Sequence, residues 1–327
     1  MISRGFVAVP VWAYAVGLII VGLLLTAPVS YRLAGAGWTR RGPRPALLLW
    51  QAVCLAAGFS VVAGLVLLAV EPLGSNIFTA AWNWFAAAFT GNLTEPAWRI
   101  GCGLAAAALT IALLAVLTRT AIRTAQRRRA HRQVLDLLTT APVRLSGRSA
   151  ELNRKLRILD HRTAVAYTLP GWHARVVLSA GLVDLLSSAE LGAVIEHERA
   201  HLRARHDLLV LPFQAWAVAL GWVPGVRLAG ASVAELTEML ADDVAALRTS
   251  RAALASALAK VALADPLGAS SAGRPAGSPA IAGTAVADRV RRLLDPHPLA
   301  GWQQAATGVA CVALLSIPAS VLLLSWG

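Results

Sequence analysis

The sequence has few cysteines and few charged residues for its length. Only Cys54, Cys102 and Cys311 occur among 327 residues, and none has a partner at the spacing of a metal or redox site. We therefore expect no disulfide bond and no cysteine-based metal site. Charged residues make up 14% of the chain, whereas 57% of the residues are hydrophobic. This balance favours a membrane protein.

Charge is absent from four long apolar segments, residues 7–27, 46–70, 100–117 and 302–326. A helix of about 20 apolar residues crosses the hydrocarbon core of a bilayer. A buried core helix of a large soluble protein is the alternative, but the length of these runs and the high hydropathy of the chain favour four transmembrane helices. The first run continues into a basic flank, so we expect it to remain as an anchor and not to be a cleaved signal peptide.

Basic residues gather at the borders of the predicted spans. The net charge is +13, and segment 71–98 contains no lysine or arginine. Two other segments, one between the first two spans and one after the third, contain Arg32, Arg40, Arg41, Arg44, Arg119, Arg123, Arg127, Arg128, Arg129 and Arg132. The positive-inside rule then predicts both termini outside and residues 119–301 in the cytoplasm. Anionic lipids account for the charge, and without a helix-turn-helix pattern we expect no direct nucleic-acid binding.

A metal-binding motif lies in the predicted cytoplasmic segment, at His197-Glu198-Arg199-Ala200-His201. On a helix, two histidines four residues apart share a face and can bind one Zn²⁺, with the glutamate beside them as a general base. Ser187 and Glu190 form a predicted capping box that starts this helix. The sequence therefore indicates metal-assisted peptide hydrolysis, with His197 and His201 as zinc ligands and Glu198 as the catalytic base.

A third zinc ligand has three candidates. Asp207 lies where one protease pattern places its last ligand, but that geometry needs the helix to break after the second histidine, and Ala204 is expected to prolong it. Glu238 is the preferred candidate, because Asp242 lies four residues further on the same helical face and can hydrogen-bond a ligand histidine. Glu235 is the competitor, but it lacks a carboxylate at the corresponding position.

These residues together resemble the membrane gluzincins, that is, the BlaR/MecR-type sensor-transducer proteases and the related HtpX-like proteases. The likeness covers roughly residues 134–300 and rests on His197-Glu198-x-x-His201, Glu238-x-x-Ala241-Asp242, and the runs at 159–161, 166–171, 176–182 and 222–224. His206-Asp207 departs from the pattern, in which an Asp is expected one position nearer the motif. The resemblance implies a zinc protease without the C-terminal penicillin-binding sensor domain, because the chain ends just after the last predicted span.

The expected fold is a mainly α membrane protein with four transmembrane helices and a cytoplasmic α+β zincin-like domain inserted between the third and fourth. Residues 1–118 form the membrane region, 119–301 the protease domain, with a flexible linker at 269–283, and 302–327 the last helix. Helices are expected at 126–140 and 151–159, and strands at 165–168 and 175–179. The second strand is either an edge strand that pairs with substrate or a purely structural one. The apolar but broken segment 208–230 is expected to lie against the membrane or the other spans.

The predicted activity is that of an integral membrane zinc endopeptidase. In BlaR/MecR-type systems the cytoplasmic protease acts on a BlaI/MecI-type winged-helix repressor, so the resemblance implies such a repressor as substrate and the lipid bilayer as the other partner. Two alternatives remain open. One is an HtpX-like quality-control protease for membrane proteins, and the other is a membrane signalling scaffold without catalytic turnover.

Overall fold

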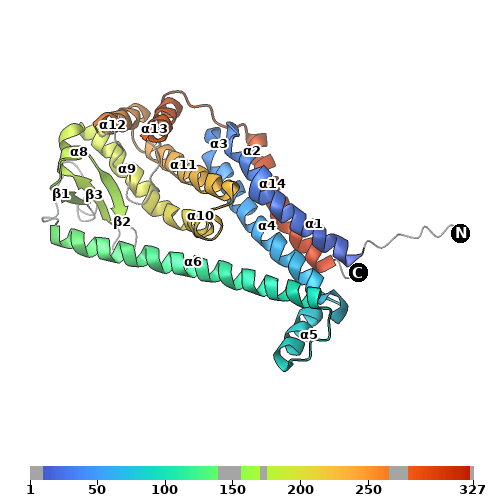
Figure 1. The fold of residues 1–327 in the computed structure, drawn as a ribbon. Helices are drawn as coiled ribbons and strands as arrows, with labels where there is room; N and C mark the ends of the chain where they lie inside the picture. The colour runs from blue at the N-terminus through green and yellow to red at the C-terminus, as the bar shows by residue number, and fades with distance from the viewer. Residues whose placement is uncertain (1–9, 139–155, 170–174, 265–278, 325–327) are drawn as a thin grey trace.

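The computed structural model describes residues 10–138, 156–169, 175–264 and 279–324, and these are mostly helical (Figure 1). Four helical stretches are long and apolar enough to cross a membrane: Val11–Ala34, Pro43–Leu73, Ala97–Arg127 and Gly301–Leu323. Each contains most of one predicted span. The chain thus has the helices of a multi-pass membrane protein.

The first two of these stretches pack closely. The first comprises α1 (Val11–Leu24), a π-helical turn η1 (Leu25–Val29) and α2 (Ser30–Ala34), and the second is formed by α4 (Pro43–Val70) and η2 (Glu71–Leu73). A Cβ atom on Gly22 would lie 2.5 Å from Val61 Cγ2, and one on Gly64 would lie 2.6 Å from the Ala15 carbonyl oxygen. Small residues at both contacts allow the two helices to approach closely.

The π-helical turn contains Pro28, which has no N–H to donate to the helix. The hydroxyl of Ser30 donates to the Leu25 carbonyl at 2.9 Å, and the hydroxyl of Thr26 donates to the Gly22 carbonyl at 2.8 Å. Side chains thus satisfy carbonyl groups around the irregular turn. Between the two spans lies α3 (Trp38–Arg41), which has Arg40 and Arg41 in its last turn.

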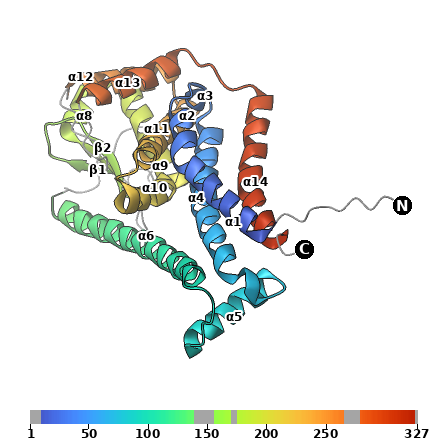
Figure 2. The same cartoon turned by 45° about the vertical axis from the view of Figure 1, so that its right-hand side comes forward.

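Two helices follow the second span. α5 (Ile77–Thr90) contains no charged residue, begins with a capping box at Asn76 and exposes Phe78, Trp82, Phe85 and Phe89. α6 (Ala97–Leu138) is one continuous helix. The helix expected at 126–140 is therefore an extension of the third span, and in both views it ends beside the sheet (Figure 2).

The sheet has three strands in the order β1-β3-β2, with β1 (Leu156–Leu159), β2 (Ala166–Leu169) and β3 (Arg175–Ser179). β1 runs parallel to β3, and β2 runs antiparallel to it. The helix expected at 151–159 is wrong for residues 156–159, because pairing with β3 holds them extended; residues 151–155 lie outside the described chain.

The strand expected at 165–168 is present one residue later, at 166–169, and the strand expected at 175–179 is present but is not an edge strand. Val176 to Ser179 are all buried, as in a strand covered on both faces. β3 is hydrogen-bonded on both sides, so it cannot pair with a substrate backbone. β2 is the edge strand that contacts the helix carrying the histidine motif.

The remaining elements are α8 (Ala180–Leu185), α9 (Ser188–Ala204), α10 (His206–Leu220), α11 (Pro224–Ala246), α12 (Arg251–Ala264), α13 (Pro279–Leu294) and α14 (Gly301–Leu324). α9 begins at the predicted capping box, with Ser187 and Glu190 bonded reciprocally. Glu190 also accepts hydrogen bonds from Ser256 and Lys260 of α12. The linker expected at 269–283 is wrong for residues 279–283, because these belong to α13. Residues 265–278 lie outside the described chain.

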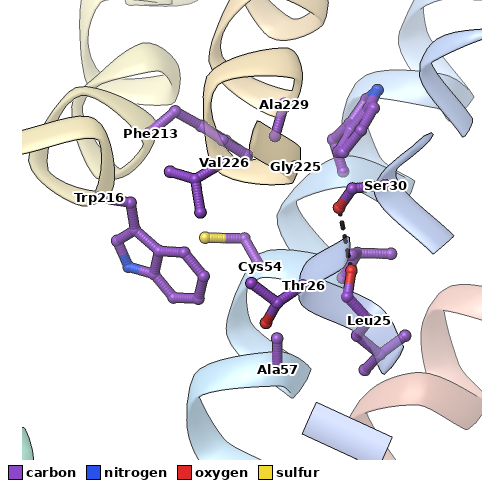
Figure 3. A pocket seen from close by; sticks show the side chains of 12 residues that line it. Leu25, Thr26, Ser30, Cys54, Ala57, Phe213, Trp216, Gly225, Val226 and Ala229 are labelled. Atoms are coloured by element: carbon purple, nitrogen blue, oxygen red, sulfur yellow. Dashed lines mark hydrogen bonds between the residues drawn. The ribbon is translucent and has the colours of Figure 1, made fainter. Parts of the chain in front are cut away.

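α10 and the first two thirds of α11 pack against the membrane helices. A hydrophobic core cluster joins Phe213 of α10 and Val233, Leu236 and Met239 of α11 to residues of α4 and of the first span. A small apolar cavity lies among these elements, where Cys54, Trp216 and Val226 point toward one another (Figure 3). Segment 208–230 therefore lies against the spans, as its composition predicts.

Candidate metal centre

Three side chains with metal-binding atoms meet between α9 and α11. They are His197 and His201, one turn apart on α9, and Glu238 of α11. The two Nε2 atoms are 3.2 Å apart. His197 Nε2 lies 3.6 Å from Glu238 Oε2, and His201 Nε2 lies 3.6 Å from Glu238 Oε1. All three side chains therefore face one common point.

The spacing of these atoms fits a tetrahedral zinc site. With zinc–ligand bonds of about 2.0–2.1 Å, the edge of a tetrahedron of ligands is about 3.3 Å. The three observed separations are close to that length. Two imidazole nitrogens and one carboxylate are also a ligand set typical of catalytic zinc, in which the fourth position stays open.

Asp242 follows Glu238 by one helical turn and contacts the other side of His197. Asp242 Oδ1 lies 2.9 Å from His197 Nδ1, an ion-pair distance, and the Asp242 side chain is fully buried. Burial opposes a charge on His197, but Asp242 and Glu238 outweigh it and raise its pKa to about 10. The same negative surroundings attract a divalent cation.

Glu198 lies next to His197 on α9 and is partly buried. Burial, which disfavours the charged carboxylate, raises the pKa of Glu198 to about 7. A carboxyl group with a pKa near neutrality can both take up and release a proton. The structure therefore places a carboxyl group with this property beside the three converging side chains.

Comparison with protein families agrees with this geometry. The model of peptidase family M48 matches residues 124–303, which is more than half of the chain. The chain belongs to peptidase family M48. Members of this family are zinc metallopeptidases. Comparisons with curated proteins and with solved structures gave no match.

One important residue of this M48 peptidase was not expected from the sequence. Arg289 of α13 is buried and donates two hydrogen bonds of 2.7 Å to the two oxygens of Asp242. Its Nη1 lies 3.1 Å from Glu238 Oε2. Burial alone would raise the pKa of Asp242, but Arg289 outweighs it and holds that pKa well below its usual value. Arg289 thus neutralises the buried carboxylates of the site.

A weak signal for Arg289 is present in the sequence. The residue shares a helical face with Val290 and Leu293, which face the core, whereas its neighbour Arg291 is exposed. The arginines at 289, 291 and 292 together also match the basic flank of a membrane span. The sequence alone therefore does not distinguish Arg289, which is buried, from Arg291 and Arg292, which are not.

The two competing ligand candidates lie elsewhere. Glu235 lies one turn before Glu238 and pairs with Arg40 of α3 at 3.0 Å. Asp207 lies in the first turn of α10 and is not part of the converging group. Of the three candidates, only Glu238 faces the two histidines.

α9 does not continue past Ala204, although Ala204 was expected to prolong the helix. Arg205 adopts a left-handed conformation with φ of 48°. The helix therefore does break shortly after the second histidine, without a glycine. The break brings His206, and not Asp207, to the site: His206 Nδ1 lies 3.0 Å from His201 Nδ1.

Proposed function

We propose that this M48 peptidase is a membrane-embedded zinc endopeptidase in which His197, His201 and Glu238 hold the metal. The observation that supports this most directly is the convergence of the three side chains at tetrahedral spacing, with Glu198 beside them. Zinc held there would supply the Lewis acidity that activates a water for attack on a peptide carbonyl. Glu198 would take up a proton from the attacking water and return it to the amine that leaves.

The other residues of the site orient this machinery. Asp242 contacts the far nitrogen of His197, and Arg289 fixes Asp242 through two hydrogen bonds. β2, the edge strand beside α9, is suited to pair with an extended substrate backbone. An endopeptidase must hold a polypeptide on both sides of the bond that it cuts, and strand pairing is one way to do so.

We further propose a signalling role, with the catalytic part in the cytoplasm and both termini outside. The support is the resemblance of the motifs to BlaR/MecR-type proteases and the arginines at the borders of the spans. The substrate proposed on this basis is a cytoplasmic BlaI/MecI-type repressor.

The catalytic proposal is tested with Glu198→Gln, which removes the base and leaves the metal ligands in place. We expect normal zinc content and a loss of cleavage of at least about 10²-fold. Glu196→Gln is the matched control: it lies on the same helix and pairs with Arg199 and Arg203, outside the site. Near-normal cleavage by Glu198→Gln would exclude Glu198 as the base.

The signalling proposal is tested by comparing proteomes after expression of the active protein and of Glu198→Ala. Loss of a repressor and release of its target genes, only with the active protein, is the expected result. Selective turnover of damaged membrane proteins would favour quality control instead. A purified wild-type protein without zinc and without cleavage would favour a scaffold.

A further inference from the structure

The imidazole of His206 lies against that of His201 at the break between α9 and α10. Arg205 turns the chain there, so that the two Nδ1 atoms are 3.0 Å apart and the rings are nearly perpendicular, at 88°. His206 is only 3% exposed. Water therefore does not compete for this contact.

The contact determines where the protons of both rings lie. His201 Nε2 faces the metal position, so it must be unprotonated when it binds, and the proton of the neutral ring is then on Nδ1. The Nδ1–H of His201 donates to Nδ1 of His206, whose own proton is consequently on Nε2.

Packing alone does not account for a histidine at this position. His206 Nε2 is buried and has no hydrogen-bond partner among the described residues. An unpaired buried donor costs about 1–3 kcal/mol, and an apolar side chain of similar size would avoid that cost. The contact of the other ring nitrogen with His201 explains why a histidine is present.

We propose that His206 is a positioning residue of the metal centre, which holds the ring of His201 by accepting a hydrogen bond from its Nδ1. Asp242 contacts His197 from the other side of the site. This inference rests on the proposed function, because His201 must be a metal ligand for its orientation to matter. Loss of such a partner typically weakens metal binding about 10- to 100-fold.

The test measures Zn²⁺ affinity of the purified full-length protein in detergent by competition with a chromophoric chelator. His206→Leu removes the acceptor, whereas His206→Asn places an amide oxygen near the position of Nδ1. His297→Leu is the control, since His297 is exposed and remote in sequence from the motif. Visible spectra of the Co²⁺-loaded proteins report the ligand geometry, and thermal melting of the metal-free proteins reports packing.

We expect His206→Leu to bind zinc about 10- to 100-fold more weakly with an altered cobalt spectrum, and His206→Asn to restore both. The metal-free His206→Leu protein should melt close to the wild type, because loss of the unpaired Nε2 offsets loss of the acceptor for the Nδ1–H of His201. Wild-type affinity in His206→Leu would overturn the inference, as would an equal loss in both variants with lower melting temperatures. Failure of the wild type itself to bind zinc would instead overturn the proposed function.

Discussion

Replacing Arg289 with methionine should destabilise the metal-free protein strongly. The change removes two hydrogen bonds of 2.7 Å to Asp242 and the ion pair of 3.1 Å to Glu238. Asp242 is fully buried, so its charge is left with His197 as its remaining cationic partner. Breaking a buried ion pair from one side costs about 3–5 kcal/mol. For a domain of this size the melting temperature should fall by roughly 10 °C.

The matched control is Arg291→Met, two residues further on the same helix. The side chain of Arg291 is 79% exposed, and its pairing with Asp288 at 3.5 Å is solvent-screened. Such exposed pairs contribute about 0–1 kcal/mol. Thermal melting in detergent, with a chelator present so that no metal compensates the charge, should therefore separate the two variants clearly.

The effect of Arg289→Met should also depend on pH. In the wild type the pKa of Asp242 is held below its usual value, so its stabilising charge is present at neutral pH and is lost only in strong acid. In Arg289→Met only His197 opposes burial, so the pKa of Asp242 should be higher than in the wild type and protonation should relieve the buried charge as the pH falls. The stability difference between the proteins should shrink from pH 8 to pH 5. Equal melting of Arg289→Met and Arg291→Met at pH 8 would refute this reasoning.

Three further predictions concern the ligands, the capping of α9 and the membrane topology. Glu238→Ala should lose far more zinc than Glu235→Ala in metal analysis, and the reverse order would contradict the ligand assignment. Glu190→Ala should lower the free energy of unfolding by about 1–3 kcal/mol, because it removes the capping box and two contacts with α12, whereas an unchanged melting curve would contradict this. A phosphatase that works only outside the cytoplasm should be active when fused after Gly91 and silent after Ala272, and the opposite result would place the protease outside.

The sequence predicted those features whose residues all lie within one helix. The motif His197 to His201 and the capping box at Ser187 depend on spacing within one helix, and both are placed as that spacing requires. Glu238 and Asp242 both face His197, as expected for two residues four apart on one helix. Each candidate span was likewise predicted from a charge-free apolar run, because the length and hydropathy of one helix are enough to identify it.

The failures involve contacts between segments distant in the sequence. Residues 156–159 resemble a helix in isolation, and only their pairing with β3 makes them a strand. The buried run in β3 could have indicated a central strand, since an edge strand usually alternates. Arg289 reaches Asp242 across 47 residues, a distance that no spacing rule covers. The break at Arg205 needs a left-handed residue, which propensity alone does not predict for arginine.

The continuity of α11 links the candidate membrane helices directly to the metal site. Its first turns line the cavity beside α4 through Gly225, Val226 and Ala229, and its later turns carry Glu238 and Asp242. Removing the spans would remove the apolar contacts of α11 with α4 and expose its apolar side to water. In a soluble fragment without the spans, we therefore expect Glu238 and Asp242 to lose their fixed positions. Detergent or lipid is therefore expected to support the geometry of the metal site, in addition to keeping the protein dissolved.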